Sequence, residues 1–387
     1  MDQARKFPVE CLDEIFQHLN GSDLVKCTLV SPEWNEFIGS TTKCMNKIQF
    51  NTNRCGSFEQ SLKVVKLIRI RKYQHIILNE RFFLEYSILR VHRPWKSIQL
   101  NSFTLSISLF KGLLAILSPS IGELVMNSVK VTSLETPQPI YNVFFQPQND
   151  AEKFTFNQLK TLKISTELQN FNVNYIKAPN LEVFHITSAR IHRPYAVKSI
   201  RDFLMTLPKL KDLRINGKWF NLIFSYYKKD FPFQLEKLSL VRGQNPTEFM
   251  THEDNFKLFL ASQNNIKKFE LNERVSLSTI SMIFNMKTLK ELTICDCSWF
   301  IWTGLCDQGA KLHHLEYLDI ITLDCNCEER IKTILSLFPG LKYLRMRSIR
   351  ANIAKFIQGN LKQIEKIQLV HRHEANIEAV LPTVKWI

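Results

Sequence analysis

Residues 207–216 read Leu-Pro-Lys-Leu-Lys-Asp-Leu-Arg-Ile-Asn, and this stretch contains the pattern that decides the fold. Leu210, Leu213 and Ile215 form the motif apolar-x-x-apolar-x-apolar, whose last two apolar residues alternate with polar ones. Alternation with period two indicates a short strand with one buried face. Because Pro208 cannot continue a helix, a helix is predicted to end directly before this strand.

The same motif occurs thirteen times along the chain, with copies that start at residues 45, 73, 95, 121, 159, 181, 210, 235, 266, 289, 315, 341 and 364. Twelve spacings cover the 319 residues from Met45 to Ile364, which is about 27 residues each. This period lies in the range of leucine-rich repeats. It predicts an α/β solenoid, a horseshoe with a parallel inner sheet and outer helices, in which each repeat buries its apolar face against its neighbours.

Other regularities support the solenoid. Residues 200–207, 256–261 and 331–338 carry apolar residues at helical spacing, and they are predicted to be crossover helices. A polar residue that can bond the backbone of the turn follows many of the strands, as at Asn51, Asn79, Asn101, Asn127, Asn216 and Asn272. The proline phrase of residues 207–213 recurs at 338–344 and 381–387, so a partial fourteenth repeat is expected. The proline-containing stretch from Thr132 to Lys153 is predicted to be an inserted loop.

Residues 7–39 break this period and are predicted to form three short helices. Val9, Leu12, Ile15, Phe16 and Leu19 share one apolar face after Pro8, which is expected at the first helical position. Asn20-Gly21 ends this helix, Ser22 is expected to cap the second, and Ser31-Pro32 starts the third. A segment of about 33 residues is too small to be stable alone, so it needs a partner, or it is a helical cap on the first repeat.

These residues resemble a known module. Residues 7–19 (FPVECLDEIFQHL), 22–24 (SDL) and 29–35 (LVSPEWN) are similar to the F-box, and Trp34, four residues after Val30, is the most specific mark. Phe7 departs from the pattern, since the family more often has Leu there. With the repeats that follow, the chain resembles F-box and leucine-rich-repeat proteins, with an F-box at residues 6–42 and repeats at residues 43–387.

The resemblance implies a substrate receptor of a Skp–cullin–F-box ubiquitin ligase. The F-box would bind a Skp-type adaptor, and through it the cullin and RING subunits, while the repeats hold a protein substrate. Such a subunit is not an enzyme, has no catalytic residues and supplies proximity between substrate and conjugating enzyme. By motif position, the adaptor-binding residues would be Pro8, Leu12, Ile15, Phe16, Leu19, Leu24, Val30 and Trp34. Two alternatives are a leucine-rich-repeat scaffold that delivers nothing for ubiquitination and a basic solenoid that binds nucleic acid.

Charge argues against the nucleic-acid alternative. The chain has 51 basic and 36 acidic residues, a net charge of +15, but the charges at strand positions three and five, which face the inside of the arc, nearly balance. Nucleic acid along this face is therefore not favoured, and a protein substrate is expected. The candidate substrate contacts on the inner face are Lys237, Lys268, Glu291, Tyr317, Asp319, Tyr343 and Arg345.

Enzyme, membrane and metal signatures are absent from the sequence. No P-loop, dinucleotide fingerprint or His-Glu-x-x-His motif occurs, and no cofactor is expected. The longest clean apolar runs fall far below the roughly 20 residues that cross a bilayer. Nine cysteines form no disulfide framework, so reduced thiols and a cytoplasmic and/or nuclear location are expected. Five cysteines between Cys295 and Cys327 lack the Cys-x-x-Cys spacing of zinc sites, so we favour buried free thiols and no metal.

Overall fold

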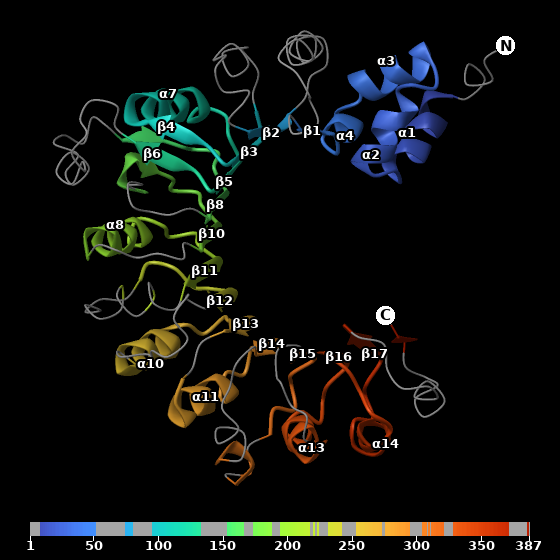
Figure 1. The fold of residues 1–387 in the computed structure, drawn as a ribbon, viewed down its shortest axis with the longest axis vertical. Coiled ribbons are helices and arrows are strands. Elements are labelled where there is room, and N and C mark those ends of the chain that lie inside the picture. The colour runs from blue at the N-terminus through green and yellow to red at the C-terminus, as the bar shows by residue number, and fades with distance from the viewer. Residues whose placement is uncertain are drawn as a thin grey trace. The chain divides into compact units, whose positions relative to one another are not determined.

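The computed structural model describes residues 8–51, 74–79, 95–132, 153–165, 173–187, 194–216, 220, 223, 231–241, 253–272, 275–294, 304–307, 309, 311–320, 328–370 and 385–386. The chain divides into two compact units, residues 1–181 and 182–387. The first unit contains an N-terminal group of helices and part of the repeats. The second unit consists of repeats alone (Figure 1).

Four helices form the N-terminal module, which we define as residues 8–48. They are α1 (Val9–Gln17), α2 (Gly21–Cys27), α3 (Pro32–Ser40) and the short α4 (Thr42–Met45). The three predicted helices are present, and α4 is an addition that the sequence pattern did not indicate.

The helix caps differ in part from the prediction. Ser31 caps α3 as expected, because its Oγ accepts a hydrogen bond from the backbone N–H of Trp34 at 3.2 Å. The expected cap of α2, Ser22, lies inside that helix instead. Asn20 is the cap, and its side-chain oxygen accepts from the N–H of Asp23 at 3.0 Å. Pro8 is the N-cap of α1 rather than its first helical residue.

The first unit contains five in-register parallel strands, in the order β1 (Gln49–Asn51), β2 (His75–Asn79), β3 (Ser97–Asn101), β5 (Glu123–Asn127) and β8 (Thr161–Ser165). On the outer side, two short strands, β4 (Thr104–Ser106) and β6 (Lys130–Thr132), pair with each other and pack against α7 (Ile107–Leu117) (Figure 1). A second short pair joins β7 (Phe154–Thr155) to β9 (Ile176–Lys177), next to the 3-10 helix Val173–Tyr175.

The second unit contains nine parallel strands in sequence order. They are β10 (Val183–Ile186), β11 (Asp212–Asn216), β12 (Lys237–Val241), β13 (Lys268–Leu271), β14 (Glu291–Ile294), β15 (Tyr317–Asp319), β16 (Tyr343–Met346), β17 (Lys366–Leu369) and β18 (Lys385–Trp386). The helices α8 (Pro194–Leu204), α10 (Glu253–Ser262), α11 (Leu277–Phe284), α13 (Glu328–Ser336) and α14 (Ala351–Asn360) lie on one side of these strands (Figure 1). The opposite side of the sheet is left open by the described helices, and we call it the open face.

Every one of the thirteen sequence motifs forms one of these parallel strands, and the partial fourteenth repeat forms β18. The predicted leucine-rich-repeat solenoid with a preceding helical module is thus confirmed. The predicted crossovers correspond to α8, α10 and α13, although α8 ends at Leu204, three residues earlier than expected. The predicted inserted loop falls on residues 133–152, which lie outside the described residues.

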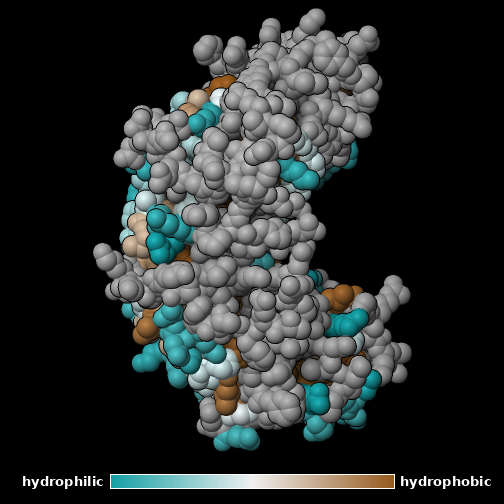
Figure 2. All heavy atoms as spheres, turned by 60° about the vertical axis from the view of Figure 1, so that its left-hand side comes forward, coloured by the Kyte–Doolittle hydropathy of each residue, from teal (hydrophilic) through white to brown (hydrophobic). Residues whose placement is uncertain are grey.

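The core consists of the inward-facing residues of successive strands. Leu213, Leu238 and Phe269 are fully buried and follow one another in register from β11 to β13. Burial of such a side chain stabilises the fold by about 1.5–3 kcal/mol, and each repeat obtains this only from its neighbours. On the outer side, the described surface is mainly hydrophilic, with hydrophobic side chains in small separate areas (Figure 2).

Two of the asparagines that follow the strands, Asn101 and Asn127, make a contact that differs from the prediction. We expected them to bond the backbone of the turn, but the Asn127 side-chain amide donates to Oδ1 of Asn101 on the neighbouring repeat at 3.0 Å. The next residues, Ser102 and Ser128, have positive φ angles of 55° and 54°, and their N–H groups still donate across to carbonyls of Asn127 and Ser165. Asn101 and Asn127 therefore link adjacent repeats at the point where the chain leaves the sheet.

Candidate functional site

The eight predicted adaptor-binding residues separate into three groups in the structure. Pro8, Ile15 and Val30 are exposed, and Leu19 and Trp34 are half-buried. Leu12, Phe16 and Leu24 are instead buried inside the N-terminal module. A buried side chain offers no surface to a partner, so only the first two groups are accessible in this structure.

Phe16 is the centre of the module's core. Its ring meets Trp34 edge-on, with 5.2 Å between ring centroids, and lies 5.7 Å from Phe37. These contacts join α1 to α3, and aromatic pairs of this geometry add to the stabilisation from burial. Phe16 therefore fixes the arrangement of the helices that carry the exposed residues.

Four large apolar side chains of the module remain exposed: Ile15, Val25, Leu29 and Val30, with exposed fractions of 46%, 41%, 83% and 64%. They lie on α1, on α2 and in the turn after α2. Among the described residues, they make up half of all exposed large hydrophobic side chains. Exposed apolar groups gathered in one small module are typical of a protein-binding surface. Val25 and Leu29 were not among the predicted adaptor-binding residues. In the structure α2 buries only Leu24, and Val25 next to it stays exposed.

The module is joined to the start of the first repeat by close contacts. The Lys47 ammonium donates to the carbonyl oxygens of Gln17 and Leu19 at the end of α1, the latter at 3.2 Å. A Cβ atom at Gly21 would overlap the carbonyl oxygen of Lys47. Lys43 of α4 pairs with Asp13 of α1 at 3.0 Å. These contacts hold α1, α2 and α4 to the segment that leads into β1.

The open face of the second unit presents two rows of side chains, one from position three and one from position five of each strand. The first row is Val183, Asp212, Lys237, Lys268, Glu291, Tyr317, Tyr343 and Lys366, and the second is His185, Arg214, Ser239, Glu270, Thr293, Asp319, Arg345 and Gln368. The strand register brings these residues side by side. All seven predicted substrate contacts belong to these rows.

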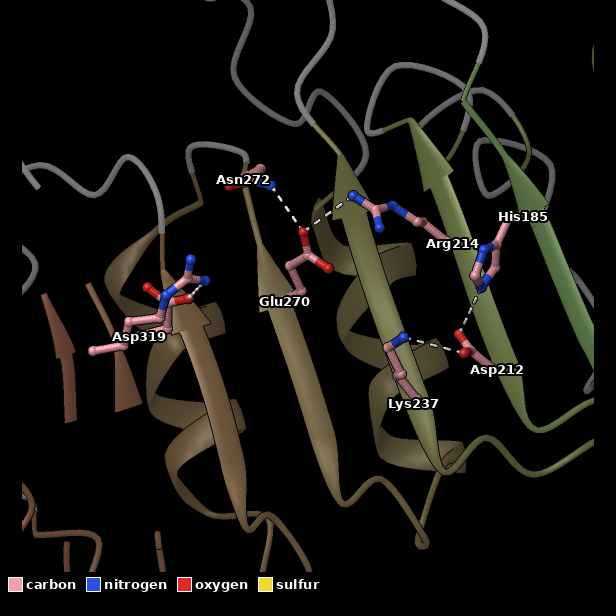
Figure 3. A network of polar contacts seen from close by, with 8 residues as sticks. His185, Asp212, Arg214, Lys237, Glu270, Asn272 and Asp319 are labelled. Atoms are coloured by element: carbon pink, nitrogen blue, oxygen red, sulfur yellow. Dashed lines mark hydrogen bonds and ion pairs between the residues drawn. The ribbon is translucent and has the colours of Figure 1, made fainter. Parts of the chain in front are cut away.

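Asp212 is shared by two neighbouring side chains, His185 and Lys237 (Figure 3). Its Oδ1 lies 3.2 Å from Nε2 of His185, and its Oδ2 lies 3.1 Å from Nζ of Lys237. Burial alone would raise the pKa of the Asp212 carboxyl, but His185 and Lys237 outweigh burial and lower this pKa. The carboxylate form of Asp212 is therefore favoured in the folded protein.

Further ion pairs continue along the sheet. Arg214 reaches Glu270 at 3.4 Å, and Asn272 donates to the same carboxylate oxygen at 3.3 Å (Figure 3). Lys268 pairs with Glu291 at 2.5 Å, and Arg345 pairs with Asp319 at 3.1 Å. Five of the seven predicted substrate contacts are thus engaged with carboxylates or cations of their own sheet. The sequence placed them on the correct face, but it did not reveal these pairings.

The two predicted tyrosines lie next to each other. Tyr317 and Tyr343 are in register on β15 and β16, and the ammonium of Lys268 lies 5.7 Å from the centroid of the Tyr317 ring. The Tyr343 hydroxyl donates to Glu365 at 3.2 Å. The pKa of Tyr317 is raised mainly by burial. The pKa of Tyr343 is also raised, mainly by its hydrogen bond to Glu365.

The open face of the first unit carries fewer charges. Glu123 of β5 accepts from Lys163 of β8 at 3.2 Å and from the hydroxyl of Ser97 at 3.1 Å. Burial lowers the pKa of His75 on β2. The other open-face residues that align across β1, β2, β3, β5 and β8 have uncharged side chains.

The described part of the chain shows neither a cluster of metal ligands nor a helix that could span a membrane. No group of three or more His, Cys, Asp or Glu side chains there could hold a metal ion. Cys295, Cys297, Cys325 and Cys327 lie outside the described residues, while Cys306 is half-buried with a free thiol. No helix within the described part of the chain is both long and apolar enough to cross a bilayer.

Comparison with known proteins identifies the N-terminal module. Residues 5–44 match the F-box domain model. No curated protein matches the chain. Among solved structures, the chain is similar to the complex of Rad7 and Elc1 from yeast, with 13% identity over 88% of both chains and a TM-score of 0.46. It is also similar to a leucine-rich-repeat protein of Leptospira interrogans, with 13% identity over 92% of this chain and 98% of the other and a TM-score of 0.26.

Proposed function

We propose that this chain, an F-box domain followed by leucine-rich repeats, is the substrate-recognition subunit of a Skp–cullin–F-box ubiquitin ligase. In this proposal the F-box binds a Skp-type adaptor, which connects it to the cullin and RING subunits. The repeats bind a protein substrate and hold it near the conjugating enzyme. The chain performs no chemistry itself, and its contribution is proximity.

The observation that carries the proposal is the exposed apolar surface of the F-box. Ile15, Val25, Leu29 and Val30 are exposed although the rest of the module is well packed around Phe16. Exposed aliphatic groups cost free energy in water, and burial against a partner recovers about 25 cal/mol per Å² of apolar surface. Pro8, at the start of α1, and the half-buried Leu19 and Trp34 are part of the proposed contact.

The buried predicted residues have a different task in this proposal. Leu12, Phe16 and Leu24 position the exposed side chains without touching the adaptor. An adaptor-binding test that replaces them would confuse unfolding with lost contact. Variants at Leu29 and Val30 avoid this difficulty, because both side chains are exposed.

The ion pairs on the open face support a protein substrate over a nucleic acid. A nucleic acid binds to several unpaired Lys or Arg side chains through its phosphates. On β10 to β16, each described basic side chain of the two rows already has a carboxylate within 4.0 Å. A cytoplasmic and/or nuclear location belongs to the same proposal, since ubiquitin ligases of this type work there.

Reconstitution tests the proposal against the scaffold alternative. The chain is co-expressed with a Skp-type adaptor and then mixed with cullin and RING subunits, and each complex is isolated by size-exclusion chromatography. A ligase receptor is expected to enter the complete assembly. Binding of the adaptor without the cullin would indicate a scaffold that delivers nothing for ubiquitination, and binding of neither would overturn the F-box proposal.

A further inference from the structure

The two rows of the open face neutralise their own charges nearly everywhere. Between β10 and β17 the rows contain four carboxylates, those of Asp212, Glu270, Glu291 and Asp319, and each one is paired with a Lys or Arg side chain of the same face. A charged ligand that binds at these positions must compete with a partner that is already in place. Such positions therefore contribute little net affinity.

Lys366 is the exception. Among the described residues of β10 to β17, it is the one cation of the two rows for which no carboxylate lies within ion-pair distance. The row continues with Lys385 in register on β18, so no acidic residue follows at that position. Two described carboxylates next to the row are engaged elsewhere: Glu365, directly before Lys366, accepts the Tyr343 hydroxyl, and Glu316, directly before Tyr317, is held by Lys290 and Lys342.

An aromatic pair adjoins this lysine. Tyr343 is the in-register neighbour of Lys366, and Tyr317 is the neighbour of Tyr343. Tyr343 is 36% exposed and belongs to the few exposed large apolar side chains of the described repeats. Tyrosine provides a large apolar contact area at a low cost in conformational entropy, and it is enriched at the centres of protein interfaces.

We propose that Tyr317, Tyr343 and Lys366 form the contact for an acidic segment of the protein substrate. A carboxylate of that segment pairs with Lys366, and an adjacent apolar side chain packs on the Tyr343 ring. This inference rests on the proposed function and adds the substrate's chemical class and its place on the sheet. Within the described rows of β10 to β17 one cation is unpaired, which suits a short acidic peptide segment rather than a polyphosphate backbone, which requires several cations.

The test uses the purified complex of the chain with its adaptor and a fluorescein-labelled peptide that repeats Glu-Leu-Glu-Gly-Ser. Fluorescence anisotropy gives its affinity for the wild type and for three variants. We expect Lys366→Glu to weaken binding by about ten-fold or more, and Tyr343→Ala by a similar factor, as for interface residues that carry much of the binding free energy. Lys355→Glu is the matched control, because Lys355 is an exposed lysine on α14. The affinity of this variant for the acidic peptide should equal that of the wild type.

A second peptide with Lys in place of Glu should not bind. Equal affinity of wild type and Lys366→Glu for the acidic peptide, or no binding to the wild type, would overturn the inference. A labelled oligouridine that binds through Lys366 in preference to the peptide would overturn it as well. Adaptor co-purification is measured on the same proteins, so its failure, which refutes the F-box proposal, is distinguished from a failure at the open face.

Discussion

Arg214 on β11 reaches Glu270 on β13, two strands away, with 3.4 Å between Nη2 and Oε1. Ser239 occupies the same row on the strand between them and is fully buried. A small residue at this position lets two long side chains meet across an intervening strand. The open face is therefore connected by ion pairs both between adjacent strands and over longer distances.

The size of Ser239 is expected to matter more than its hydroxyl. Ser239→Leu places a branched side chain between Arg214 and Glu270 and should lower the free energy of unfolding by about 1–3 kcal/mol. Ser239→Ala should leave it unchanged or raise it by up to about 1 kcal/mol, because the buried Ser239 hydroxyl has no hydrogen-bond partner among the described residues. Urea denaturation measures both. A loss with Ala equal to that with Leu would contradict this role.

The F-box core should be separable from its surface. Phe16→Ala removes a fully buried ring and is expected to destabilise the module by about 3–5 kcal/mol. Ile15→Ala, one residue away but exposed, should change stability by less than about 0.5 kcal/mol. Hydrogen exchange of the amides in α1 to α4 follows the module separately from the repeats. Similar losses for both variants would show that Ile15 also belongs to the core.

Two glycines of the F-box should respond in opposite ways to alanine. At Gly21 a Cβ would overlap the Lys47 carbonyl oxygen, so Gly21→Ala should loosen the contact between α2 and the start of the first repeat. At Gly39 in α3 no atom lies within 4 Å of such a Cβ, and Gly39→Ala should be neutral or stabilising by about 0.5–1 kcal/mol. The same hydrogen-exchange measurement compares them, and equal effects would refute the close approach at Gly21.

Asp212 should make stability depend on pH. Its pKa in the folded protein is lower than the ordinary value of 3.8, so it contributes stability that is present above pH 3.8 and lost as the pH falls through the folded pKa. Asp212→Asn is therefore expected to be destabilising near pH 7 and to approach the wild type at lower pH. Urea midpoints across this range measure the difference. Asp254→Asn, at a carboxyl that is 94% exposed, is the control and should show little effect. A pH-independent difference for Asp212→Asn would contradict the ion-pair explanation.

The repeat period was sufficient to predict the strands, because each repeat buries its leucines only against the next one. Even β18 followed from the recurrence of the proline phrase at residues 381–387. The pairings on the open face could not be predicted in the same way. The Arg214–Glu270 pair depends on strand register and on the small size of Ser239, which 56 residues of separation in the sequence do not reveal.

The F-box shows the same limit at the level of single residues. The motif identified the correct segment, but it assigned Phe16 and Ile15 to one surface although the first is buried and the second is exposed. Helical spacing places apolar residues over nearly half of the circumference of a short helix. Packing against α3 then decides which of these side chains are buried and which remain exposed. Leu29 lies in a turn, where no periodicity indicates exposure.

Binding of a Skp-type adaptor by the exposed apolar residues of the F-box is tested most directly by an affinity measurement. Biolayer interferometry should compare the wild type with Val30→Asp and with Leu258→Asp, a control at a leucine that is 60% exposed on α10 of the second unit. We predict that Val30→Asp weakens adaptor binding at least about ten-fold, since a charge would be buried in the contact, while Leu258→Asp binds as the wild type does. Equal affinity of Val30→Asp and the wild type, or no adaptor binding by the wild type, would contradict the account.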